Sequence, residues 1–207
     1  ISRTVRLLRE LGVGPHDGVA LLLPNAPETH IALWAAETAG FAVPLNSLLE
    51  PSLVTSLLAA SRARVLVTAG PLLDPIIWDK AVKAAEGAPW LRHVLAVGGG
   101  APASLGAVEV VPFGRADELP AAPLPAEELH PGDRAACFHT GGTTGAPRLA
   151  RHTHANQLYA AWALAEVGDM VSTDTVVVGL PLYPVTAAVR VGVPDFVYLT
   201  VSTGLGG

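Results

Sequence analysis

One stretch of the sequence is rich in groups that could hold phosphate. Residues 140–148 read Thr-Gly-Gly-Thr-Thr-Gly-Ala-Pro-Arg and follow an apolar run at 135–138. Glycines let the backbone take positive φ and approach a ligand closely, and consecutive N–H groups in such a turn form an anion-binding concavity. Threonine hydroxyls add donors, and an arginine fork matches two phosphate oxygens. The residues of this candidate phosphate loop are Thr140, Gly141, Gly142, Thr143, Thr144, Gly145 and Arg148.

The loop does not have the pattern of the common nucleotide-binding turns. A Walker A loop needs a second glycine where Pro147 stands, and no Gly-x-Gly-x-x-Gly turn is present. Residues 149–154 read as a strand and a helix follows from about Ala155, so we expect the loop to join two strands. A Gly/Thr run alone is also typical of an ordinary surface hairpin, so the residues leave both interpretations open.

The elements that must position this loop alternate along the chain. Continuous apolar runs predict buried strands, and runs with helical periodicity between Pro and Gly signals predict helices. The predicted strands are 19–24, 41–45, 64–68 and 93–97, and the predicted helices are 1–11, 28–39, 51–63 and 74–86. This alternation predicts an α/β fold of layered, parallel-rich sheets with flanking helices.

Changes in composition suggest where the chain divides. Residues 98–131 are rich in Gly and Pro and predict loops with one short strand at 107–111. We therefore expect a first α/β lobe over 1–130, with a Pro/Gly-rich connection from about 98. The phosphate-loop hairpin and the start of a second lobe then occupy 131–189, and 190–207 receives no assignment.

Composition excludes several classes of protein. The 207 residues carry a formal net charge of −5, only 15% are charged, and Cys137 is the single cysteine. A net negative chain without a basic run is a poor nucleic-acid ligand, and one cysteine cannot form an internal disulfide framework. No apolar run reaches the ~18 residues that a membrane span needs. These features predict a cytoplasmic protein without a membrane span.

Four histidines, at 130, 139, 152 and 154, suggest a metal site at first sight. No Asp or Glu stands at ligand spacing beside them, so polar flanks of the loop are the preferred interpretation and no metal ligand is assigned. Cys137 lies inside an apolar strand, which predicts a buried and unreactive thiol. No residue is assigned as catalytic on these grounds.

Three stretches of the sequence resemble one protein family. Residues 138–148, followed by Thr-His-Ala-Asn at 153–156, resemble the phosphate-loop signature of the adenylate-forming (AMP-binding) superfamily. Residues 11–25 through Pro-Leu-Asn at 44–46 are similar to the N-terminal segment of acyl-CoA synthetases, and Leu-Pro-Leu-Tyr at 180–183 resembles a motif before their acyl pocket. The resemblance covers about residues 1–189, as the N-terminal part only of an AMP-dependent acid–CoA ligase.

The resemblance implies a reaction and a set of roles. Such enzymes use MgATP and a carboxylic acid to form an acyl-adenylate and pyrophosphate, and CoA then accepts the acyl group, as in fatty acid metabolism. Residues 140–145 would wrap the β- and γ-phosphates, Arg148 would stand where the family usually has Lys, and Tyr183 would line the acyl or adenylate pocket. The implied ligands are therefore ATP, Mg²⁺, CoA and a carboxylic acid.

The chain also departs from the family pattern. Gly141 replaces a common Ser, Arg148 replaces Lys, and Pro184 stands in place of His. The Tyr-Gly-x-Thr-Glu segment and the C-terminal adenylation Lys do not occur in these 207 residues. The resemblance thus implies a fragment that does not complete adenylation alone. The alternative is a non-catalytic degenerate paralogue or a nucleotide- or partner-binding module. An incomplete core would expose apolar surface, which favours a homodimer.

Overall fold

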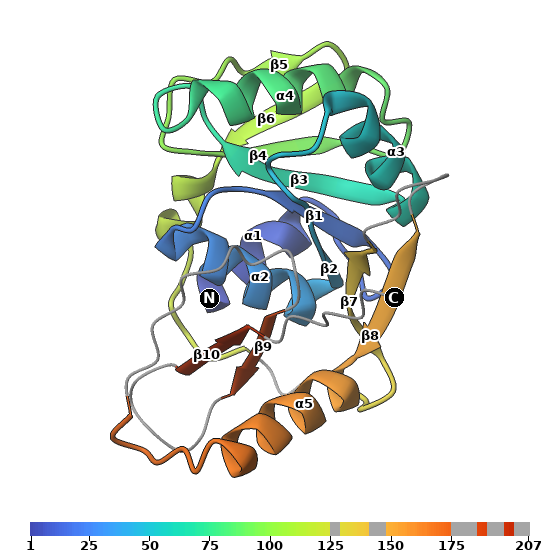
Figure 1. Cartoon of the computed structure of the whole chain (residues 1–207). Helices are drawn as coiled ribbons and strands as arrows, with labels where there is room; N and C mark the ends of the chain where they lie inside the picture. The colour runs from blue at the N-terminus through green and yellow to red at the C-terminus, as the bar shows by residue number, and fades with distance from the viewer. Residues whose placement is uncertain (125–128, 141–147, 175–185, 190–196, 201–207) are drawn as a thin grey trace.

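The structure of the chain is a computed structural model that describes residues 1–124, 129–140, 148–174, 186–189 and 197–200. Most of its strands belong to one sheet, drawn in Figure 1. They are β1 (Gly18–Leu22), β2 (Phe41–Pro44), β3 (Ala63–Ala69), β4 (His93–Val97), β5 (Ser104–Leu105), β6 (Val108–Pro112), β7 (Arg134–His139) and β8 (Leu149–Thr153). Their order across the sheet is β5-β6-β4-β3-β1-β2-β7-β8.

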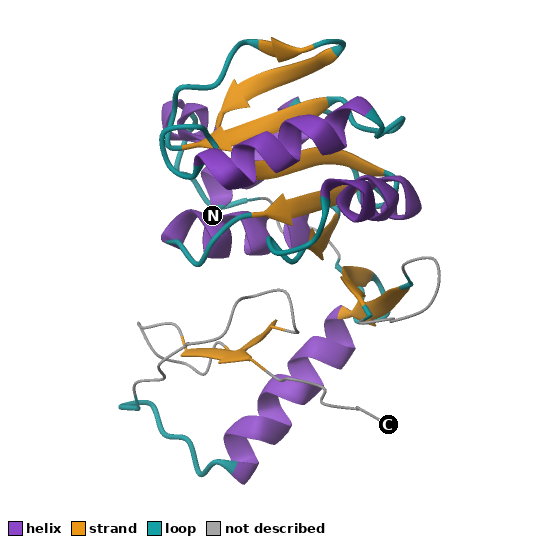
Figure 2. Ribbon diagram, turned by 45° about the horizontal axis from the view of Figure 1, so that its top comes forward, coloured by secondary structure: helices purple, strands orange, loops and turns teal. Residues whose placement is uncertain are grey.

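Helices flank this sheet, and a small second sheet lies apart from it. The helices are α1 (Ser2–Glu10), α2 (Pro27–Ala39), α3 (Pro51–Ser61), α4 (Pro75–Glu86), the 3₁₀ helix η1 (Phe113–Glu118) and α5 (His154–Val167). The second sheet pairs β9 (Thr186–Val189) with β10 (Val197–Thr200) in antiparallel fashion, and β9 lies beside α5 (Figures 1 and 2).

The central strands are parallel and covered on both faces. All residues of β1 and β2 are buried, which agrees with their unbroken apolar sequence. The chain steps from β1 to β2 in one direction and then to β3 and β4 in the other. Because parallel crossovers are right-handed, α2 covers one face beside α1, while α3 and α4 cover the opposite face (Figure 2).

The predicted α/β class and its strand–helix alternation are confirmed. Strand β4 begins and ends where the sequence predicts, and the other strands and helices through residue 97 agree within two residues. The Gly/Pro-rich segment holds more order than predicted, since β6 is joined by the short antiparallel strand β5 and by η1. Strand β7 pairs in parallel with β2, so the hairpin extends the same sheet.

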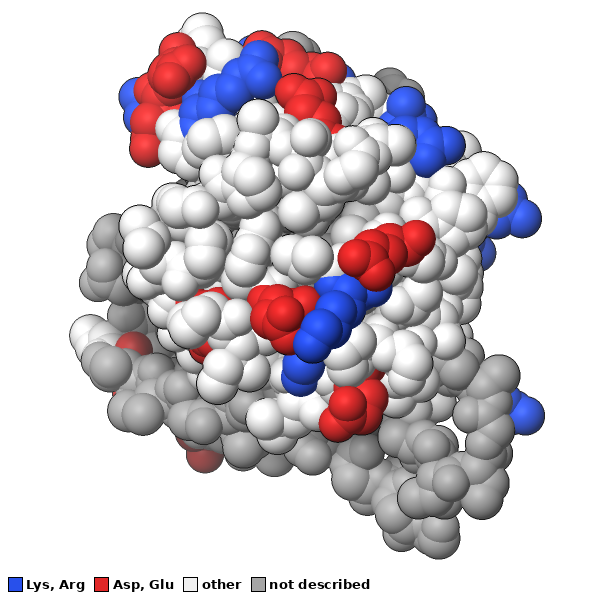
Figure 3. Space-filling view, turned by 90° about the horizontal axis from the view of Figure 1, so that it is seen from above, with Lys and Arg blue, Asp and Glu red and all other residues white. Residues whose placement is uncertain are grey.

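Surface charge is mixed on the face that α4 and β5 form. Acidic and basic side chains alternate there (Figure 3), and Lys83 pairs with Asp79 one helical turn away on α4, at 2.6 Å. No helix within the described part of the chain is long and apolar enough to cross a membrane.

Candidate phosphate-binding hairpin

The base of the candidate phosphate loop is a closed antiparallel hairpin. His139, the last residue of β7, pairs with Leu149, the first residue of β8. The backbone N–H of Thr140 then donates to the carbonyl oxygen of Arg148 at 3.0 Å. The predicted strand–loop–strand arrangement is therefore present at its two ends, and the Thr140 and Arg148 side chains are both exposed there.

The remaining predicted site residues lie outside the described residues. They are Gly141, Gly142, Thr143, Thr144 and Gly145 of the loop, and Tyr183. Of the predicted set, the structure brings together Thr140 and Arg148. The bond between them occupies the Thr140 N–H, so the hydroxyl is the donor that this residue has left for a ligand.

The hairpin opens at the edge of the sheet where the parallel strands end. Strands β1, β2, β3 and β7 run in the same direction, so their carboxyl ends share one edge. The chain order also reverses there, with β2 and β3 on opposite sides of β1. Crevices at such switch points are where open α/β sheets bind ligands, and the loop begins on the same edge of the sheet, beyond β2.

A side chain ties the hairpin to the neighbouring strand. The backbone N–H of Asn46, just after β2, donates to Nε2 of His139 at 3.2 Å. The Asn46 side chain in turn accepts from the N–H of Leu48 at 2.8 Å, which shapes the connection to α3. Partial burial lowers the pKa of His139, so the neutral ring that can accept this bond is favoured.

A buried polar pair joins α5, the helix after the hairpin, to α2. Gln157 Nε2 donates to Glu37 Oε1 at 2.9 Å, and both side chains are buried. Burial raises the pKa of Glu37 to about 8, although the hydrogen bond from Gln157 acts in the opposite direction. Sequence reasoning missed this pair. A glutamate among the apolar positions of α2 was the available signal.

The helix after the hairpin begins one residue earlier than predicted. Thr153 caps α5: its hydroxyl accepts from the N–H of Asn156 at 3.2 Å, and the Asn156 side chain accepts from the N–H of Thr153 at 3.1 Å. In this reciprocal capping box Thr153 precedes the first turn of α5 and keeps an extended conformation. Strand β8 therefore continues to Thr153. His154 therefore belongs to the helix, whereas His152 stays in the strand.

Two other residues that the sequence singles out, His152 and Cys137, contribute to packing. The His152 ring meets the Phe138 ring edge-on, with 4.9 Å between centroids. Cys137 is buried and free, as predicted, and burial raises the pKa of its thiol. Among the described residues, no three His, Cys, Asp or Glu side chains gather in a way that could hold a metal ion. The described hairpin thus offers groups that fit phosphate, but no ligand set for Mg²⁺.

Comparisons with known sequences identify the family of the chain. The pattern of the family described as AMP-binding enzyme matches residues 1–194. The chain is 28% identical over 191 residues to the marinolic acid–CoA ligase of Pseudoalteromonas sp. (strain SANK 73390), covering 88% of this chain and 28% of that protein. It is 30% identical over 194 residues to the long-chain-fatty-acid–CoA ligase FadD13 of Mycobacterium tuberculosis, covering 92% of this chain and 35% of that protein. The chain spans about a third of the length of these relatives.

Solved structures of similar proteins share the fold. The N-terminal domain of FACL13 from Mycobacterium tuberculosis superposes with a TM-score of 0.66 at 27% identity, over 87% of this chain and 42% of that one. FadD1 from Archaeoglobus fulgidus, a long-chain-fatty-acid–CoA ligase, superposes with a TM-score of 0.71 at 23% identity, over 87% of this chain and 34% of that one. This similarity supports the fold alone. Because the family pattern covers nearly the whole chain, the protein belongs to the AMP-binding enzyme family.

Proposed function

We propose that this chain is the ATP-holding part of an AMP-forming acyl-CoA synthetase. The observation that carries the proposal is the closed Thr140–Arg148 hairpin, which begins the Gly/Thr loop at the carboxyl edge of a parallel sheet. Family membership and the acid–CoA ligases among the relatives support the reaction class. Of the finer properties, we propose a cytoplasmic location and a fatty or related carboxylic acid as substrate.

In the proposed reaction, a carboxylate oxygen attacks the α-phosphorus of ATP. An oxygen–phosphorus bond forms to give the acyl-adenylate, and pyrophosphate leaves with the electrons of the broken bond. The CoA thiolate then attacks the acyl carbon and AMP leaves. Positioning and charge stabilisation carry most of such a reaction. Mg²⁺ would enter with ATP and neutralise phosphate charge.

The chain's own residues would act on the departing pyrophosphate. The Thr140 hydroxyl and the loop's N–H groups from Gly141 to Gly145 would donate to the β- and γ-phosphate oxygens. Arg148, exposed beside Thr140, would offset their charge with a bidentate fork. Tyr183 would line the acyl or adenylate pocket. We also propose the domain division at about residue 130, where residues 131–189 hold the hairpin, which joins the sheet of the first lobe, and the start of the second lobe.

The test uses the complete product of the reading frame that encodes these residues. We expect exchange of pyrophosphate into ATP that depends on an added carboxylic acid. Arg148→Ala should lower the exchange at least tenfold, and Arg148→Lys should raise it above the wild type if the position serves as the family's lysine does. An exchange rate that neither change alters would contradict the role of Arg148.

A non-catalytic nucleotide- or partner-binding module is the second candidate. The arginine at position 148 and the proline at position 184 favour it, because an arginine fork is not equivalent to a lysine point charge and a proline offers no proton. ATP binding without exchange, across short, long and aromatic acids, would select this module over the synthetase.

We also propose that the 207-residue chain forms a homodimer. Helix α5 exposes Leu158, Tyr159 and Trp162, which are 65%, 68% and 56% accessible. An apolar surface of this kind favours association. Light scattering should give twice the monomer mass for this chain, and a monodisperse monomer would contradict the proposal.

A further inference from the structure

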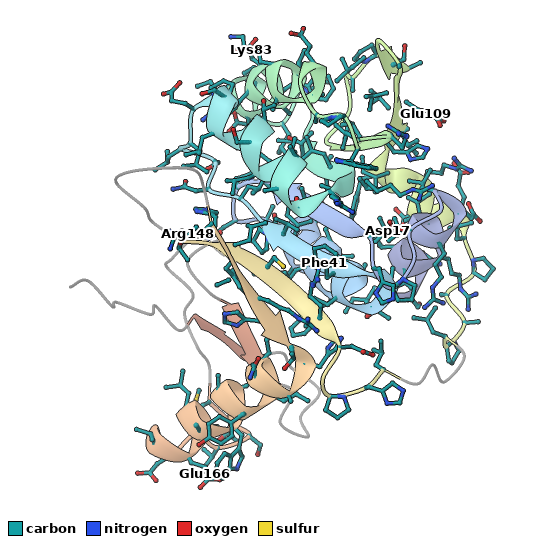
Figure 4. All side chains as sticks on the ribbon, turned by 90° about the vertical axis from the view of Figure 1, so that its right-hand side faces the viewer. Asp17, Phe41, Lys83, Glu109, Arg148 and Glu166 are labelled. Atoms are coloured by element: carbon teal, nitrogen blue, oxygen red, sulfur yellow. The ribbon has the colours of Figure 1, made fainter. Side chains whose placement is uncertain are left out.

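A cleft lies at the opposite end of the hairpin from the phosphate loop. Its volume is about 640 Å³, within the range of small-molecule sites. It lies where Phe41 begins β2 and Arg134 begins β7, beside the turn at 13–16 that leads into β1. This is the amino edge of the sheet. Figure 4 shows Arg148 on one side of the molecule and Asp17, next to that turn, on the other, with Phe41 between them.

The cleft concentrates positive charge in a chain that is negative overall. Among the described residues, Arg9, Arg134 and Arg151 line the cleft, and Asp133 is the one acidic residue in its wall. That carboxylate is already engaged, since Asp133 Oδ2 accepts from the N–H of His130 at 2.9 Å. The chain as a whole carries −5, and the face in Figure 3 mixes both signs. The local excess of cations therefore suits an anion.

Two of the guanidinium groups have fixed positions and donors to spare. Arg134 lies over the Phe41 ring, with its Cζ 4.5 Å from the centroid. Stacking uses the face of the guanidinium and leaves its five N–H groups, which lie in the plane, free to donate. Arg151 Nη2 donates to the carbonyl of Gly132 at 3.2 Å, which leaves four donors. In the described part of the chain, neither group forms a salt bridge.

We propose that this cleft is a second anion site, which binds a phosphate dianion carried on a small organic molecule. Two arginine forks, from Arg134 and Arg151, match the oxygens of a tetrahedral dianion. His154, half-buried in the wall, adds an imidazole that can donate or accept. Val13 and Leu129 give the wall an apolar part that an organic body could contact. The site is separate from the proposed ATP loop.

The probe is inorganic phosphate, added to the 207-residue chain at constant ionic strength with chloride as the balancing salt. The reporter is the imidazole resonance of His154. We expect a saturable shift, and we expect Arg134→Gln and Arg151→Gln each to raise the dissociation constant at least tenfold. Arg62→Gln is the matched control, because Arg62 is also exposed and stacked, on Trp90 at 5.2 Å, away from the cleft. It should change the constant less than twofold.

Arg148→Gln separates this site from the phosphate loop and should leave the His154 titration unchanged. Loss of the shift in Arg148→Gln would assign the phosphate to the loop and overturn the proposal. A shift that never saturates, or one that Arg62→Gln weakens equally, would indicate diffuse screening and also overturn it. Thermal unfolding checks that each variant folds. If Arg134→Gln does not fold, Arg151→Gln alone tests the proposal. Pyrophosphate exchange is measured separately, so failure here does not affect the synthetase proposal.

Discussion

Asn46 and His139 are 93 residues apart in the sequence, yet one hydrogen bond of 3.2 Å joins them at the carboxyl edge of the sheet. Asn46 ends the Pro-Leu-Asn segment, which begins at the last residue of β2, and His139 is the last residue before the phosphate-loop segment. The bond therefore ties together two stretches that resemble the same family for separate reasons. It gives His139 a positioning role, because a fixed imidazole holds the end of β7 against the β2–α3 connection.

The first prediction concerns the acceptor of this bond. His139→Phe removes Nε2 and leaves the Asn46 N–H without its partner, which should lower the free energy of unfolding by about 1–3 kcal/mol. His139→Gln, whose amide oxygen can accept, should lose less. Urea unfolding of the 207-residue chain measures both changes. An equal loss of unfolding free energy in the two variants would mean that packing of the imidazole ring, and not its hydrogen bond, stabilises the fold here.

The same residue should contribute to acid sensitivity. Burial lowers the pKa of His139 below its ordinary value of 6.5, so below that value the unfolded chain binds more protons than the folded one. The stabilisation is present above pH 6.5 and is lost as the pH falls. Unfolding followed from pH 7.5 to 5 should show stability declining, with a shallower decline in His139→Gln. Unchanged pH dependence in that variant would contradict the assignment.

Glu37 should give the opposite pH dependence. Its folded pKa of about 8 lies above the ordinary 4.5, so the folded chain holds a proton that the unfolded chain releases. The free energy of unfolding should therefore fall by about 1.4 kcal/mol per pH unit between these two values. Glu37→Gln keeps an acceptor for Gln157 and removes the ionisation. It should unfold at a higher temperature than the wild type at pH 8.

A surface glutamate provides the control for that change. Glu118→Gln removes the same charge from an exposed position in η1, and exposed substitutions usually alter stability by less than about 0.5 kcal/mol. Stabilisation of equal size in Glu118→Gln and Glu37→Gln would show that net charge, and not burial of this carboxyl, is responsible.

Local signals explain how much of the fold could be predicted. Pro27 and Gly40 bracket α2 in the sequence as they do in the structure, and the apolar run at 93–97 becomes β4. The hairpin was predictable because residues 135–139 and 149–153 flank a Gly/Thr turn. Strand β5 was not, since two residues carry no periodicity and depend on pairing with β6.

Contacts within the site were harder to predict than its position. One bond runs from the Asn46 backbone N–H to the His139 side chain, and the other joins the side chains of Gln157 and Glu37. Both join residues that are distant in the sequence and that only the fold brings together. Arg134 and Arg151 gave no sequence signal, because they lie 17 positions apart in the sequence and belong to no motif. Their shared cleft arises from the antiparallel pairing of β7 with β8.

Gly40 should be intolerant of any side chain. A Cβ there would lie 2.4 Å from the carbonyl oxygen of Asp17 and 2.8 Å from that of Gly14, both of which are backbone atoms. Gly40→Ala should lower the free energy of unfolding by about 1–3 kcal/mol, as overpacking does. Gly114→Ala is the control, because no atom lies within 4 Å of a Cβ at that position. Equal effects on thermal unfolding would contradict the steric explanation.

The capping box at the start of α5 should behave as one unit. Thr153→Ala should cost about 1 kcal/mol, and Asn156→Ala a similar amount, because each removes a partner that the other residue needs. Once one partner is gone, the second change has less to remove, so the double variant should lose less than the sum of the two single losses. Urea unfolding of the four proteins gives the coupling free energy, with Thr153→Ser as the variant that keeps the hydroxyl. Strict additivity would show that the two bonds form independently, and that β8 is held to α5 by the rest of the sheet rather than by this box.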